Sequence, residues 1–136
     1  MAGTNPIRMV LDPRNSISKK ANVLHQDAQT IVFNTIKSET AQQTQWHKVN
    51  ANAILEQVLL WAHQNEIQSI LVEGGAHTIE GFIEKNIWDE CRIIQSKTKL
   101  NDGVKAPKEP LGKKMTQKLV GDQLQIILNE KQTLKI

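Results

Sequence analysis

Ile70-Leu71-Val72-Glu73-Gly74-Gly75-Ala76-His77-Thr78 is the stretch of sequence that decides the fold. Residues 69–72, which contain the apolar run Ile70-Leu71-Val72, predict a buried strand, and the two glycines that follow end it. A helix is then expected, because Ile79, Phe82 and Ile83 lie at the spacing of one helical face and the pattern ends near Asn86. Glycine lets a ligand approach the backbone, and a helix start presents N–H groups without partners and a partial positive charge. The order strand, glycines, helix therefore predicts a site for a phosphate or pyrophosphate.

The same residues leave a second interpretation open. Gly74 and Gly75 could serve only as a tight turn between a strand and a helix. The pattern is not a dinucleotide fingerprint, because the next glycine is Gly81, and no Gly-Lys-Ser/Thr follows as in a P-loop. Glu73 is either a surface carboxylate or a group that faces the crevice at the carboxyl end of the strand, where open α/β sheets bind ligands.

Apolar patterns on the amino-terminal side predict three strands and a helix. The strands are expected at residues 7–11 and 30–33 and, more weakly, at 46–49, while residues 15–29 read as a loop. The helix is expected from Asn50 or Asn52, either of which can cap it, to a point near Asn65.

On the carboxyl-terminal side, residues 89–97 read as a strand with Cys91, Ile93 and Gln95 on one face. Residues 100–113 read as irregular, and residues 115–120 and 124–128 read as a closing antiparallel hairpin. Strands that alternate with helices predict an α/β domain with a mixed, mostly parallel sheet, flanked by helices and closed by an antiparallel edge.

Length and composition restrict the class of protein. The chain has 136 residues, 39% of them hydrophobic, and no apolar run long enough to span a membrane, so one domain, residues 1–136, is expected. Cys91 is the single cysteine and the four histidines are scattered, so neither a disulfide scaffold nor a structural zinc site is expected. We expect a cytoplasmic protein, with Cys91 acting as a buried small hydrophobic residue and not as a nucleophile.

Basic residues are concentrated in one segment, although the net charge is only +3. Seven lysines lie between Lys97 and Lys118, with no aromatic residue among them to stack on a base. We interpret the segment as a solvated surface and expect no nucleic-acid partner; the alternative is salt-sensitive nucleic-acid binding through these lysines.

Several motifs resemble the reductase domain of the RibD family of riboflavin biosynthesis proteins. They are Pro6-Ile7-Arg8-Met9-Val10-Leu11-Asp12, Val72-Glu73-Gly74-Gly75, Ile87-Trp88-Asp89-Glu90-Cys91-Arg92 and the loop Asp102-Gly103-Val104-Lys105-Ala106-Pro107. They occur in the family's order, and the resemblance extends over residues 5–129. It implies a dihydrofolate-reductase-like fold and an enzyme that uses NADPH to reduce the ribose of 5-amino-6-(5-phosphoribosylamino)uracil to a ribityl chain.

The resemblance also implies roles for individual residues. Glu73 would contact the substrate, and the cofactor-binding residues would be Pro13, Gly75, Ala76, His77, Thr78, Ile79, Glu80 and Gly81. Relatives commonly carry serine at the position of Pro13, which has neither a hydroxyl nor an N–H to offer. His77 could bind a phosphate or cap the helix. No catalytic residue and no metal ligand is assigned, and a homodimer is expected.

The resemblance has one large departure, at the amino-terminal end. Family members carry further strands before the Pro-Ile-Arg strand, and we read residues 1–4 as an artificial or re-started N-terminus. We therefore expect a carboxyl-terminal reductase fragment that keeps the binding half and does not catalyse the reduction alone. The alternative function is a non-catalytic α/β module that binds a phosphate-bearing ligand or assists assembly.

Overall fold

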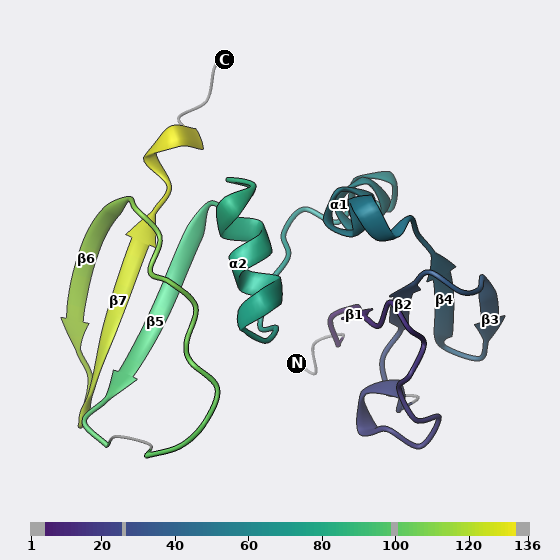
Figure 1. Cartoon of the computed structure of the whole chain (residues 1–136), viewed down its shortest axis with the longest axis horizontal. Coiled ribbons are helices and arrows are strands. Elements are labelled where there is room, and N and C mark those ends of the chain that lie inside the picture. The colour runs from purple at the N-terminus through teal and green to yellow at the C-terminus, as the bar shows by residue number, and fades with distance from the viewer. Residues whose placement is uncertain (1–4, 26, 99–100, 133–136) are drawn as a thin grey trace. The chain divides into compact units, whose positions relative to one another are not determined.

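The computed structural model describes residues 5–25, 27–98 and 101–132, which form two compact units, Met1–Ser69 and Ile70–Ile136 (Figure 1). Within the described residues, no helix has the length and the apolar character needed to cross a membrane.

The first unit is built on a four-stranded sheet. Its strands are β1 (Arg8–Leu11), β2 (Thr30–Asn34), β3 (Glu39–Ala41) and β4 (Thr44–Lys48), in the order β1-β2-β4-β3. The pairs β1–β2 and β2–β4 are parallel, and β3 pairs with β4 antiparallel. All five residues of β2 are buried, as expected of a central strand covered on both faces.

Helix α1 (Ile54–Gln64) supplies one cover of this sheet. Val58 and Trp61 pack with Ile31 and Phe33 of β2 in the core of the unit, and the Phe33 and Trp61 rings meet edge to face, 5.8 Å between centroids. A short 3-10 turn, Ala51–Ala53, precedes the helix, and the Asn50 side chain caps that turn by accepting a hydrogen bond from Asn52 N at 2.9 Å. The predicted helix is confirmed, but Asn50 caps the 3-10 turn and not α1, whose N-cap residue is Ala53 and has no side-chain cap.

The opposite face of β2 is covered by the loop that was predicted at residues 15–29, which contains a short 3-10 turn, Asn22–Leu24. Leu24 and Ala28 are buried, and the Thr30 hydroxyl donates to the carbonyls of Val23 and Ala28. This loop takes the place of the crossover helix that connects parallel strands and covers the sheet in many α/β proteins.

The second unit contains helix α2 (Ala76–Glu84) and an antiparallel sheet. Its strands are β5 (Glu90–Ser96), β6 (Lys113–Lys118) and β7 (Asp122–Leu128), in the order β5-β7-β6. The predicted hairpin is confirmed, and Gly121 adopts a φ of 87° in its turn, a conformation that favours glycine. The Asn129 side chain ties the end of β7 to the segment after α2 by donating to the Trp88 carbonyl at 2.7 Å.

The predicted strand at residues 69–72 is wrong. These residues lie in no strand, and the Leu71 side chain is 83% exposed. An apolar run becomes a strand only when a neighbouring strand takes up its backbone N–H and C=O groups, and the described residues provide no such neighbour here. The mixed α/β class is confirmed, but the parallel share is smaller than predicted, since two of the five strand pairs in the described residues are parallel.

Candidate functional site

The glycine turn leads directly into α2. Gly75 is the residue at the N-cap position, and its carbonyl accepts from Thr78 N at 3.0 Å and from Ile79 N at 3.3 Å. The N–H groups of Ala76 and His77 precede these bonds, so no carbonyl within the helix is available to them. The start of α2 therefore offers two backbone donors together with the positive end of the helix dipole.

The space around the Cα atom differs between the two glycines. A Cβ atom on Gly74 would come within 2.9 Å of Thr78 Cβ, so Gly74 is needed for packing against the first turn of the helix. A Cβ on Gly75 would meet nothing within 4 Å, and Gly75 has ordinary extended angles, φ −64° and ψ 168°. A tight turn thus accounts for Gly74 but leaves Gly75 unexplained, because any residue could adopt its conformation.

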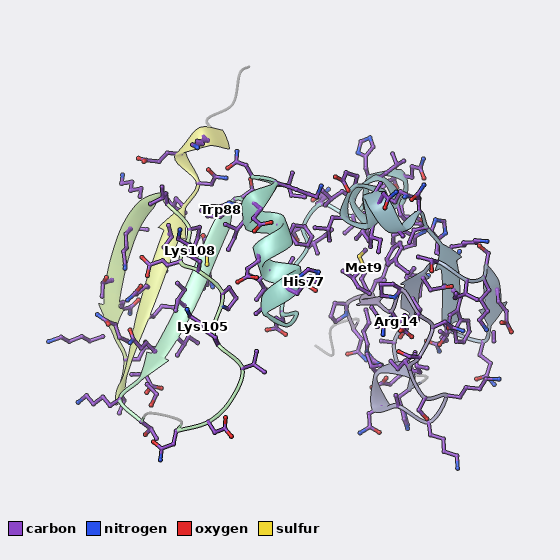
Figure 2. All side chains as sticks on the ribbon, in the orientation of Figure 1. Met9, Arg14, His77, Trp88, Lys105 and Lys108 are labelled. Atoms are coloured by element: carbon purple, nitrogen blue, oxygen red, sulfur yellow. The ribbon has the colours of Figure 1, made fainter. Side chains whose placement is uncertain are left out.

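The predicted cofactor residues at 75–81 do not all face the same way. His77 is exposed (Figure 2), whereas Ala76, Thr78, Ile79, Glu80 and Gly81 are half-buried. Seven consecutive residues span about two turns of helix, so one ligand cannot touch all of them. His77 stands at the second helical position and not at the cap, so the interpretation of His77 as the helix cap is wrong. Glu73 is exposed beside the turn.

The first unit carries a second group of predicted residues, at the carboxyl end of β1. The Asp12 side chain is buried, and its carboxylate accepts from Ser16 N at 2.9 Å, Ser16 Oγ at 3.0 Å and Ile17 N at 2.8 Å. Burial alone would raise the pKa of Asp12, but the hydrogen bonds from Ile17 and Ser16 outweigh burial and hold that pKa below its ordinary value. Asp12 therefore organises the loop as a fixed anion.

Pro13 follows Asp12 and is exposed. Its carbonyl accepts from Thr35 N at 3.0 Å and from Thr35 Oγ1 at 2.8 Å, so the loop after β1 is fastened to the loop after β2. Asn34 shapes that second loop, since its side-chain oxygen accepts from Ile36 N and Lys37 N. Sequence reasoning missed Asn34 and Thr35, although a polar pair directly after a buried strand is a usable signal.

The carboxyl ends of β1, β2 and β4 thus lie at one edge of the first sheet. This is the edge at which parallel α/β sheets bind ligands. A shallow depression of about 320 Å³, lined by Gln29, Thr40, Gln42, Gln43, Thr44 and Gln45, lies at the opposite ends of β2 and β4 and adds nothing to this edge. In the described part of the chain, no group of three or more His, Cys, Asp or Glu side chains could hold a metal ion.

Removing the Asp12 carboxylate is expected to destabilise the first unit in a pH-dependent way. Asp12→Asn should lower the free energy of unfolding at pH 7 by about 2 kcal/mol, because hydrogen bonds to a charged acceptor are lost. The folded-state pKa is below the unfolded one, so the contribution is complete above the unfolded pKa and is lost as pH falls through the folded pKa. Urea unfolding at pH 7 and at pH 3 checks this prediction; a difference between the two proteins that stays constant with pH contradicts it.

Cys91 is half-buried on β5, so its burial is less complete than predicted. Burial first, and then the Glu109 carboxylate, raise the pKa of its thiol. Because the thiolate is the reactive form, alkylation of the native protein at pH 7.5 is expected to be at least about tenfold slower than in urea. Labelling at the same rate in both states would show that Cys91 is a reactive thiol.

The fold and the two groups of residues define a mixed α/β protein that presents strand ends and a helix start in the manner of ligand-binding α/β domains. The model of the RibD C-terminal domain family matches residues 1–98, and the chain belongs to this family.

Named relatives agree with that membership. The chain is 29% identical over 96 residues to the 2,5-diamino-6-ribosylamino-4(3H)-pyrimidinone 5′-phosphate reductase of Archaeoglobus fulgidus, a match covering 65% of this chain and 44% of the relative. It is 26% identical over 104 residues to riboflavin biosynthesis protein RibD of Aquifex aeolicus, covering 73% of this chain and 29% of the relative. The chain therefore spans less than half the length of these relatives.

A solved structure has the same fold. It is the riboflavin biosynthesis reductase Rib7 of Saccharomyces cerevisiae, with a TM-score of 0.71 and 17% identity, covering 92% of this chain and 70% of that one. The likeness confirms the predicted dihydrofolate-reductase-like fold.

Proposed function

We propose that this chain is part of an NADPH-dependent reductase of riboflavin biosynthesis, which converts the ribosyl group of a phosphoribosylaminopyrimidine to ribityl. The observation that carries the proposal is Gly75, which lacks a Cβ at an open helix start where neither packing nor φ requires glycine. Family membership and the names of the relatives, which are reductases of a ribosylaminopyrimidinone phosphate, support the reaction type.

The residues present fit such a cofactor. The Ala76 and His77 N–H groups can donate to a pyrophosphate that approaches over Gly75, and the exposed His77 side chain can add a donor. The cofactor, when bound, supplies the hydride that reduces the sugar carbon. The part of the second unit is to hold phosphates at the glycine turn and to offer Glu73 as a hydrogen-bond acceptor for substrate hydroxyl or amine groups.

The proposal also specifies which pyrimidine ring the substrate carries. The relatives from Archaeoglobus fulgidus and Aquifex aeolicus are named for a diaminopyrimidinone, and another relative is named RibD. We propose 5-amino-6-(5-phosphoribosylamino)uracil as the substrate, with a non-catalytic phosphate-ligand-binding module as the second candidate function. The exposed Leu71 favours that second candidate, because the strand expected before Glu73 is not formed.

Glu73→Gln tests the proposed function. The variant should bind NADPH as tightly as the wild type and bind the phosphoribosylaminopyrimidine at least about tenfold more weakly, because a charged acceptor is lost. Titration calorimetry measures both affinities, and loss of the reduced nicotinamide's absorbance measures turnover, with the full-length Archaeoglobus fulgidus reductase as the positive control. Absence of NADPH binding by the wild type at millimolar concentration contradicts the proposed reductase.

The proposal includes a cytoplasmic homodimer. Ile94 on β5 and Met115 on β6 are 67% and 46% exposed, an apolar surface that a second copy could cover. Sedimentation equilibrium at micromolar concentration measures the oligomeric state directly, and a monomer at all concentrations would remove this part of the proposal.

A further inference from the structure

Strand β6 forms an open edge of the sheet in the second unit. The strand order is β5-β7-β6, and among the described residues no strand pairs with the outer side of β6 (Figure 1). All six residues of β6 are exposed. An edge strand of this kind presents backbone N–H and C=O groups without partners, which a further extended segment can take up.

The register of the hairpin identifies which backbone groups of β6 point outward. The hairpin closes where Leu119 N donates to the Asp122 carbonyl at 2.9 Å, and along an antiparallel ladder hydrogen-bonded pairs alternate with pairs that are not hydrogen-bonded. Counting back from this closing pair, the residues of β6 that bond to β7 are Lys113, Met115 and Gln117. The residues whose N–H and C=O groups point away from β7 are Lys114, Thr116 and Lys118.

The side chains of these outward residues are basic at both ends. Since successive side chains of a strand point to opposite faces, Lys114, Thr116 and Lys118 share one face of the sheet. The Lys114 ammonium group already binds a carboxylate, that of Glu109 at 2.7 Å. Lys118 has no ion-pair partner among the described residues. The edge therefore binds one carboxylate within its own unit and has a second ammonium group that can bind another.

Charge excludes a second copy of β6 as the segment that covers this edge. Two copies that paired antiparallel around Thr116 would place Lys114 of one directly opposite Lys118 of the other, on the same face. Like charges directly opposite each other destabilise a strand pair, whereas opposite charges stabilise it. The homodimer proposed above concerns an exposed face of the sheet and not this edge.

We propose that β6 docks an acidic extended segment of a partner protein as an additional strand. Main-chain hydrogen bonds at the outward residues supply affinity, and the two lysines supply selectivity. Carboxylates that lie beside Lys114 and Lys118 stand four residues apart on one face of the added strand, with a residue beside Thr116 between them. The two intervening residues lie on the opposite face, beside Met115 and Gln117, where apolar side chains fit.

A peptide of this pattern tests the proposal. The probe is fluorescein-labelled Ser-Glu-Val-Thr-Val-Glu-Ser, and its matched control carries lysine in place of both glutamates. Fluorescence anisotropy at low salt should show the acidic peptide binding at least about tenfold more tightly, because like charges are brought together in the control. Amide exchange followed by NMR should slow at Lys114, Thr116 and Lys118 on binding, and the amides of Met115 and Gln117, which already bond to β7, should not change.

Three variants separate strand addition from general attraction to a basic surface. Thr116→Pro removes one outward N–H and keeps the bonds to β7, so it should weaken the acidic peptide about tenfold while Tm falls little. The double variant Lys114→Gln, Lys118→Gln should weaken it about fivefold and reduce its salt dependence. Lys97→Gln removes the same charge just after the other edge strand, β5, and should change the affinity by less than about twofold.

The outcomes are distinct. Slower exchange confined to the outward amides, together with weaker binding by Thr116→Pro, supports strand addition; if that variant does not fold, the amide exchange of the wild type and the double lysine variant decide. Equal binding of the acidic and control peptides, or no binding at millimolar concentration, overturns the proposal. Binding of single-stranded oligothymidine that requires Lys114 and Lys118, without binding of the acidic peptide, assigns the lysines to nucleic acid and also overturns it. None of these measurements involves NADPH, so their outcome is independent of the proposed function.

Discussion

Gly112→Ala is expected to lower the free energy of unfolding by about 3 kcal/mol, the upper end of what overpacking usually costs. Gly112 directly precedes β6, and a Cβ on it would lie 2.2 Å from the Leu128 carbonyl oxygen and 3.0 Å from Ile127 Cγ2. The obstacle is backbone of β7, which cannot rotate away as a side chain could. The clash is removed only if the first residues of β6 separate from β7, beginning at the pair Lys113–Leu128.

Thermal unfolding followed by circular dichroism measures this effect, and Tm should fall by about 10 °C. Gly75→Ala is the matched control, because its Cβ meets nothing within 4 Å and its φ of −64° suits alanine. At an N-cap the change from glycine to alanine loses a little helix stability and gains a similar amount by restricting the unfolded chain, so Tm should barely move. An equal fall in Tm in both variants would mean that Gly112 does not lie this close to the Leu128 carbonyl.

Local patterns predicted the elements whose structure depends on their own residues. Helices α1 and α2 follow apolar positions spaced three and four apart, and the β6–β7 hairpin follows two apolar runs around Gly121. Apolar strands such as β1, β2 and β5 were predicted as well, although their partners are distant in the sequence. Two segments whose composition does not match their structure were missed or wrong. The polar strand β3 exists because it pairs with β4, whereas residues 70–72 carry a strand's composition and form none.

Only the part of the candidate site that is contiguous in the sequence could be predicted. The glycine turn was predictable because Glu73 to Gly81 are contiguous and the chemistry of a helix start is local. The sheet edge was not, because it brings together Asp12, Thr35 and Lys48 from three separate segments. Nor could the sequence tell that Gly74 is needed for packing on Thr78 while Gly75 is not, since that difference depends on the space around each Cα.

Gly75→Val is expected to weaken NADPH binding about a hundredfold, equivalent to about 2.8 kcal/mol, without unfolding the protein. A valine here enters open space, so the core is untouched, but its methyl groups occupy the volume through which a phosphate must come to reach the Ala76 and His77 N–H groups. Charged hydrogen bonds are short, so an obstacle of this size cannot be passed by a small shift of the ligand.

Titration calorimetry with NADPH measures the effect, and the Tm of each variant shows that the fold is kept. Gly75→Ala should fall between wild type and valine, because one methyl group obstructs less of the approach than three carbon atoms. Ala41→Val places the same side chain on the exposed strand β3 and should leave NADPH binding unchanged. If Gly75→Val and wild type are both folded and bind NADPH equally, the phosphate does not bind next to Gly75. The start of α2 is then not the cofactor site. If NADPH affinity falls stepwise from glycine through alanine to valine at position 75 and Ala41→Val has no effect, the cause is steric exclusion at this turn. A general effect of valine on the protein is then ruled out.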